Sequence, residues 1–199
     1  MTWEDWIPND RTLVPGFELW RSGELNQALS FFERFLSDHP DDAAALRGCA
    51  SVLWTQGKFD EALQFFQKAV RVDCWNPMHW SNLGLVFRDL NRRLQAIRTF
   101  EVAVALDPCY EPAYNEWANV LFDEGHYADA LLLYEKALSV NPSRAVLHHN
   151  RGVCLRFMGN TDAAISSFRK ALESDPTYSH TIQELLRLGI NITPAATAR

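Results

Sequence analysis

Residues 77–110 read PMHWSNLGLVFRDLNRRLQAIRTFEVAVALDPCY. Aromatic and small side chains stand here in a fixed order: Trp-x2-Leu-Gly-x2-Phe begins at Trp80, Ala-x3-Phe begins at Ala96, and Pro108 ends the pattern. Such residues at helical spacing, with a break near Asn91, predict two short helices joined by a turn.

The pattern of residues 77–110 recurs along the chain with a period of 34 residues. An alanine series and an aromatic series keep this register: Ala28, Ala62, Ala96, Ala130, Ala164, and Phe32, Phe66, Phe100, Tyr134, Phe168. A turn series and a series of stop positions do the same: Gly23, Gly57, Asn91, Gly125, Gly159, and Pro40, Cys74, Pro108, Pro142, Pro176. Asn91 fits its series because Asn best replaces Gly where a turn needs a positive φ.

This order and period resemble those of the tetratricopeptide repeat family, over residues 9–178. The resemblance implies an all-α fold, a right-handed α-solenoid of about five helix-turn-helix repeats with a C-terminal capping helix. The expected segments are an N-terminal Trp-containing segment (1–8), five repeats (9–42, 43–76, 77–110, 111–144, 145–178), a capping helix (179–188) and a flexible tail (189–199).

The segments that flank the repeats raise a separate question. Trp3 and Trp6 would be costly to leave in water, so they either cover the exposed end of the first repeat or dock on another copy. Residues 179–188 predict an amphipathic helix with Ser179 as its N-cap.

Composition and motifs argue against several classes of protein. The 199-residue chain is 47% hydrophobic with a net charge of -6, and an acidic surface disfavours nucleic-acid binding. No apolar run approaches the roughly 18 residues that cross a bilayer, and the first residues lack a secretory signal, so we expect a cytoplasmic protein without membrane insertion. The cysteines show no metal-ligand spacing and no nucleotide or nucleophile motif occurs, so we expect no metal, no cofactor and no catalysis.

The 3.6-residue period divides each first helix into an apolar stripe and a second stripe. In the tetratricopeptide family the second stripe lines a concave groove that holds an extended peptide or a partner helix. Carried over position by position, the resemblance implies a groove made of Arg47, Ser51, Asn82, Leu85, Arg88, Asn115, Glu116, Asn119, Phe122, His149, Asn150 and Arg156.

Asparagine side chains are the informative members of this groove. An amide offers a donor and an acceptor, so it can pair with the main chain of a bound peptide whatever the peptide sequence. Asn82, Asn119 and Asn150 also stand where the family often has asparagine, so family consensus alone explains them equally well.

One well-defined family site is predicted to be missing. The carboxylate clamp of this family holds the acidic C-terminal tails of heat-shock chaperones. Arg47 and Asn82 match it, but Ser51, Pro112 and Glu116 do not, and Glu116 would repel a carboxylate. The sequence therefore predicts that such tails do not bind.

The sequence favours a non-catalytic interaction module, an adaptor, scaffold or assembly chaperone that binds a peptide or helix of another protein. Two alternatives stay open. One is a structural protein that self-assembles through Trp3, Trp6 or the solenoid ends. The other is the targeting segment of a larger enzyme.

Overall fold

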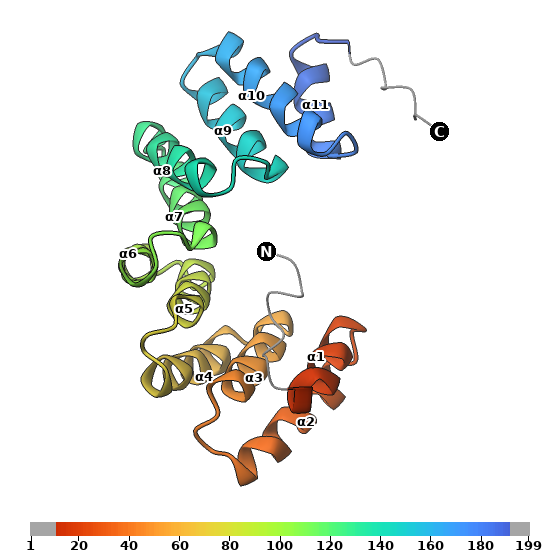
Figure 1. The fold of residues 1–199 in the computed structure, drawn as a ribbon, viewed down its shortest axis with the longest axis vertical. Coiled ribbons are helices and arrows are strands. Elements are labelled where there is room, and N and C mark those ends of the chain that lie inside the picture. Colours follow the sequence, from red (N-terminus) through yellow and green to blue (C-terminus); the bar gives the residue numbers. More distant parts are fainter. Residues whose placement is uncertain (1–10, 192–199) are drawn as a thin grey trace. The chain divides into compact units, whose positions relative to one another are not determined.

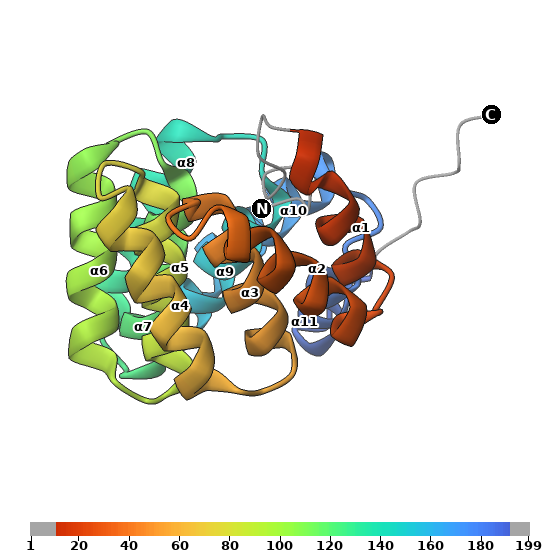
Figure 2. The same cartoon turned by 90° about the horizontal axis from the view of Figure 1, so that it is seen from below.

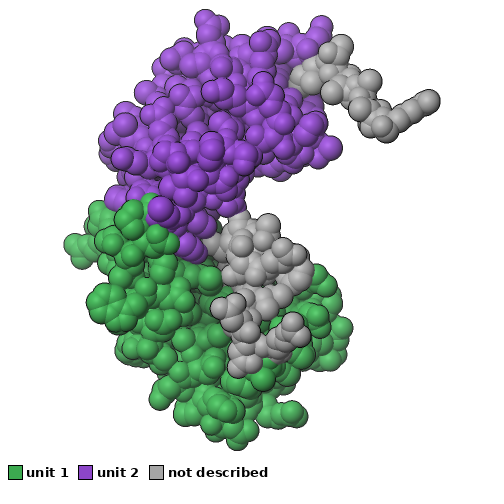
Figure 3. All heavy atoms as spheres, in the orientation of Figure 1, with its two compact units in different colours: residues 1–108 green, residues 109–199 purple. Residues whose placement is uncertain are grey.

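The computed structural model of the chain describes residues 11–191, which form helices joined by short turns. The chain divides into two compact units, residues 1–108 and residues 109–199 (Figure 3), and each unit is described by itself. No strand occurs among residues 11–191, so the predicted all-α fold is confirmed. The predictions for Trp3 and Trp6 concern residues outside this range.

Helix bounds follow the repeat pattern of the sequence. In the first unit a short 3-10 helix (Arg11–Leu13) precedes α1 (Val14–Arg21), α2 (Leu25–Asp38), α3 (Ala43–Thr55), α4 (Phe59–Val72), α5 (Pro77–Asp89) and α6 (Arg93–Leu106). In the second unit the helices are α7 (Glu111–Asp123), α8 (Tyr127–Val140), α9 (Ala145–Phe157), α10 (Thr161–Ser174) and α11 (Ser179–Arg187).

Helices pack in the way that stacked helix-turn-helix repeats require. The two helices of each repeat lie antiparallel against each other, as α3 and α4 do in the first unit and α9 and α10 in the second (Figures 1 and 2). The second helix of a repeat also contacts the first helix of the next, as α4 does with α5 and α8 with α9. Because one repeat cannot bury its apolar face alone, these contacts between neighbours complete the core.

The two apolar series of the repeat form the centre of that core. All five alanines and all five aromatic residues of these series are at most 2% exposed. Small residues of the first helices lie against the aromatic rings, and an added Cβ on Gly16, Gly84 or Gly152 would meet Phe32, Phe100 or Phe168. The alanine and glycine positions therefore set how closely paired helices approach.

The turns between paired helices have the backbone geometry that the sequence predicts. Gly23, Gly57, Gly125 and Gly159 have φ between 76° and 84°, and Asn91 has φ 58°. Among residues 11–191, Asn91 is the only non-glycine residue with a positive φ.

The C-terminal helix differs in detail from the sequence-based prediction. The N-cap of α11 is Tyr178, without a capping side-chain hydrogen bond, and Ser179 is the first helical residue. Beyond the helix, Ile190 packs on a cluster that includes Leu155 and Leu185. Residues 192–199 of the predicted tail lie outside the described range.

Candidate functional site

Two first helices of the first unit, α3 and α5, carry the N-terminal part of the predicted groove. Trp54 of α3 donates a hydrogen bond from Nε1 to Oδ2 of Asp89 on α5, at 2.7 Å, so the two helices are neighbours. We define the α3–α5 face as Arg47, Ser51, Ser81, Asn82, Leu85 and Arg88.

Most side chains of the α3–α5 face are buried. Arg47, Ser51 and Leu85 are at most 8% exposed, whereas Arg88 is half-buried. The Arg47 guanidinium lies 5.0 Å from the centre of the Phe17 ring, and the Ser51 hydroxyl donates to the Arg47 carbonyl at 2.8 Å. Arg88 pairs with Asp89 at 3.1 Å, so much of its charge is neutralised within the face.

Asn82 stands at the middle of this face with its hydrogen-bonding capacity unused. It is 1% exposed, and neither its Nδ2 nor its Oδ1 has a hydrogen-bond partner. The hydroxyl of Ser81, which is also fully buried, lacks a partner too. A buried polar group without a partner costs about 1–3 kcal/mol, so this arrangement works against folding stability.

His79 adds a third buried polar group beside the face. Burial, together with the positive charge of Arg47, lowers the pKa of His79 to about 4, although Asp73 lies 3.6 Å from its Nε2 and acts in the opposite direction. The imidazole is therefore neutral at pH 7, and its Nδ1 has no hydrogen-bond partner. The sequence analysis missed His79 because its repeat position belongs to neither stripe.

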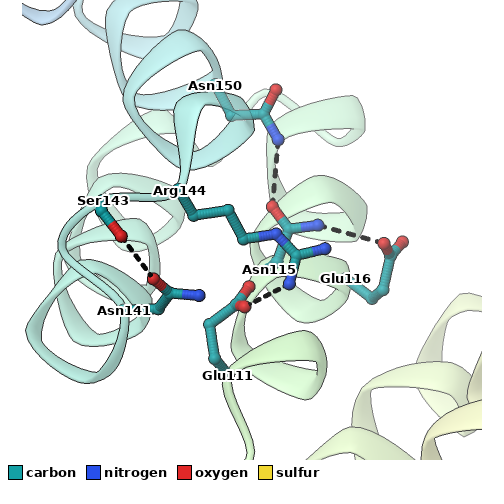
Figure 4. A network of polar contacts seen from close by, with 7 residues as sticks. All are labelled: Glu111, Asn115, Glu116, Asn141, Ser143, Arg144 and Asn150. Carbon is teal, nitrogen blue, oxygen red and sulfur yellow. Dashed lines mark hydrogen bonds and ion pairs between the residues drawn. The ribbon is translucent and has the colours of Figure 1, made fainter. Parts of the chain in front are cut away.

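In the second unit, α7 and α9 carry the remaining predicted residues, and here the polar groups pair with one another (Figure 4). Asn150 of α9 donates to Oδ1 of Asn115 on α7 at 3.0 Å, and Asn115 in turn donates to Glu116 at 3.0 Å. Close by, buried Glu111 accepts a hydrogen bond from Arg144 at 2.5 Å. We define the α7–α9 face as Asn115, Glu116, Asn119, Phe122, His149, Asn150 and Arg156.

Asn119 belongs to the same network. Its Oδ1 accepts from the Tyr134 hydroxyl at 2.8 Å and from Asn150 at 3.4 Å, while its Nδ2 donates to Glu116 at 3.3 Å. Burial raises the pKa of Tyr134, so the phenol remains a donor at all ordinary pH values. The amides of the α7–α9 face thus have partners within the protein.

The far end of the α7–α9 face contacts the last helix. His149 is within 2.9 Å of the Thr181 hydroxyl, and burial lowers the pKa of His149 to about 4. Arg156 pairs at 3.0 Å with Glu184, a buried carboxylate of α11, and stacks 4.7 Å from the centre of the Phe157 ring. These contacts attach α11 to the repeat before it.

Neighbouring first helices are also joined by a recurring contact that the sequence analysis did not find. Nε1 of Trp20 donates a hydrogen bond to the Thr55 hydroxyl at 2.8 Å, and Nε1 of Trp54 donates one to Asp89 at 2.7 Å. The rings of Phe122 and Phe157 meet edge to face, with their centres 5.2 Å apart. Each pair joins positions 35 residues apart. In the sequence, each of these aromatic residues is followed 35 positions later, which is one repeat plus one residue, by the residue that it contacts.

The two faces therefore differ in how their amide side chains are paired, a difference that their sequences did not predict. The α7–α9 face satisfies its own amides, whereas Asn82 in the α3–α5 face does not have a partner. Within residues 11–191 there is no group of three or more His, Cys, Asp or Glu side chains that could hold a metal ion. Likewise, none of the described helices is long and apolar enough to cross a membrane.

Comparison with family models and known proteins agrees with the helix pairs. Two models, both described as tetratricopeptide repeat, match residues 18–79 and 110–177. The chain is 33% identical over 81 residues to the TPR repeat-containing thioredoxin TTL4 of Arabidopsis thaliana, a match that covers 41% of this chain and 12% of that protein.

A longer match and a solved structure complete the comparison. The chain is 30% identical over 124 residues to the protein CTR9 homolog of Arabidopsis thaliana, covering 62% of this chain and 11% of that protein. It thus spans about an eighth or less of the length of either relative. The structure of YrrB, described as a TPR protein with an unusual peptide-binding site, is 25% identical with a TM-score of 0.65, over 85% of this chain and 87% of that one.

Proposed function

The chain belongs to the tetratricopeptide repeat family, and from that premise we propose that it is a non-catalytic binding module whose α3–α5 face holds an extended segment of another protein. Proteins of this family are generally protein-protein interaction modules. The proposal adds a place and a mode of binding to that general statement.

The observation that carries the proposal is the unpaired amide of Asn82. Both of its polar atoms are buried without a partner, and an extended main chain supplies a C=O and an N–H that can satisfy them together. Ser81 and His79 of the same helix carry two further buried polar atoms without a partner. A group that weakens folding but matches a ligand is what a binding site is expected to contain.

Two further considerations support a peptide as ligand. The solved relative YrrB is described as having a peptide-binding site, although an unusual one. The face also contains apolar Leu85 and the aliphatic part of Arg47, which suit the side chains that flank a bound main chain. The α7–α9 face is less suited to main-chain pairing, because its amides would first have to leave their present partners.

The experiment selects peptides from a random display library on the full chain and measures their affinity for three proteins. These are the wild type, Asn82→Ala, and the control Asn26→Ala, which changes an exposed asparagine of α2. We expect Asn82→Ala to lose about fivefold to 100-fold in affinity, since two hydrogen bonds of about 0.5–1.5 kcal/mol each disappear. The control should bind like wild type.

The opposite result would remove the proposal. If Asn82→Ala and Asn26→Ala bind the selected peptides equally well, the α3–α5 face is not the binding site. If the selected peptides do depend on Asn82, a competition assay in which they displace a protein partner extends this result to the natural ligand. The proposal also includes a cytoplasmic location and the absence of catalytic activity, as the sequence predicts.

A further inference from the structure

The α3–α5 face is more deeply buried than the equivalent face of the second unit. Arg47, Ser51 and Asn82 are at most 3% exposed. Asn119 and Asn150, which hold the repeat positions of Ser51 and Asn82, are only half-buried. Since all of these residues stand on the second stripe of their first helices, a face open to solvent should leave them similarly accessible. The difference indicates that the α3–α5 face is covered.

The start of the described chain lies beside this face. Leu13 is 1% exposed and packs in one cluster with Ala45 and Cys49 of α3. The Phe17 ring of α1 lies 5.0 Å from the Arg47 guanidinium. The described chain therefore begins next to the Arg47 end of the α3–α5 face.

A segment that enters at Arg47 can also reach Asn82. Asn115 and Asn150 are 35 residues apart and are hydrogen-bonded at 3.0 Å. Arg47 and Asn82 hold the equivalent repeat positions, so they face each other from α3 and α5. Residues 1–10 lie outside the described range. Ten extended residues span about 33–36 Å and packed helices lie about 8–10 Å apart, so these residues are long enough to cross both helices.

The composition of residues 1–10, MTWEDWIPND, suits a covering segment. Trp3 and Trp6 supply a large apolar area, and the segment has three acids and no Lys or Arg. An acidic segment suits the buried cation Arg47, although Asp73 and Asp89 already offset part of the positive charge around the face. Charge therefore contributes less to this match than position and aromatic content do.

We propose that residues 1–10 cover the α3–α5 face of their own chain and have to leave it before a segment of another protein binds. This inference rests on the proposed function, because it concerns the same face. Tethering gives residues 1–10 a roughly millimolar effective concentration, which favours them over an unlinked segment of equal affinity. Both polar atoms of Asn82 nevertheless stay without a partner. A partner segment that pairs its main chain with Asn82 gains these hydrogen bonds and can therefore displace the cover.

A photo-crosslinker at position 6 tests the contact without any added peptide. Trp6→p-benzoylphenylalanine in the full chain should form adducts at or beside residues of the α3–α5 face, in a product that keeps the 22.8 kDa mass of one chain. The same group at Leu94, which is 75% exposed on α6, is the control and should not react with this face. Adducts confined to other helices, adducts between two chains, or no adduct at all overturn the proposal.

Peptide affinity tests the competition. Trp3→Ala with Trp6→Ala loosens the cover, so this double variant should bind Asn82-dependent peptides at least about threefold more tightly than wild type. The control Trp75→Ala removes a tryptophan that is 80% exposed on the turn between α4 and α5, and should bind like wild type. Unchanged or weaker affinity of the double variant overturns the proposal. If no selected peptide depends on Asn82, the proposed function fails, while the cross-link still decides whether residues 1–10 cover the face.

Discussion

The backbone of Gly84 lies against the ring of Phe100, so that a Cβ added to Gly84 would come within 2.6 Å of Cε1 of that ring. Phe100 is completely buried. We expect Gly84→Ala to lower stability by about 1–3 kcal/mol, because the overpacking exceeds the gain in helix propensity. For a chain of this size that is a fall of roughly 2–4 °C in melting temperature per kcal/mol.

Pairing this change with Phe100→Leu provides its control. A smaller side chain at position 100 leaves room for the new methyl group, so the double variant should lose less stability than the sum of the two single changes. Strict additivity would mean that the close approach of Gly84 to Phe100 does not limit the packing.

Asn91 is the turn residue whose geometry can be improved. Its φ of 58° is a conformation that glycine adopts more easily than any residue with a Cβ. We expect Asn91→Gly to raise the free energy of unfolding by a few tenths to about 1 kcal/mol, and Asn91→Ala to lower it by about 1 kcal/mol. Urea denaturation measures both, and a more stable Asn91→Ala would contradict the role assigned to the turn.

The fold could be predicted from sequence because its determinants repeat. Alanine, aromatic and turn residues recur every 34 positions, so one register accounts for every helix pair, including the turn at Asn91. The site could be predicted only in outline. Asn82 and Asn150 hold equivalent positions of their repeats, yet Asn150 has Asn115 and Asn119 within reach and Asn82 has no such partner. That difference depends on neighbouring helices, which no single repeat encodes.

Asn82 and Asn150 should respond in opposite ways to the same substitution. Asn82→Leu removes a buried amide that has no partner, so we expect it to raise the free energy of unfolding by about 1–2 kcal/mol. Asn150→Leu withdraws the donor that serves Asn115 and Asn119, and should lower it by about 1–3 kcal/mol. Urea denaturation of both variants is the measurement. A destabilised Asn82→Leu would show that this amide is structural rather than kept for a ligand.

Two buried histidines should make stability depend on pH. Burial lowers the pKa of His79 and of His149 from 6.5 to about 4. Arg47 acts in the same direction on His79 and Asp73 opposes it, while Glu184 opposes the shift of His149 and His180 adds to it. Between pH 6.5 and 4 the unfolded chain therefore binds protons that the folded chain does not, so stability is complete above pH 6.5 and falls as the pH drops toward 4. Each histidine should contribute roughly 1–3 kcal/mol to this loss, since one pKa unit corresponds to about 1.4 kcal/mol. His79→Gln and His149→Gln should each flatten the pH dependence of urea denaturation over this interval, while the exposed control His126→Gln should not. An unchanged slope in both buried variants would mean that these imidazoles take up protons as easily in the folded chain as in the unfolded one.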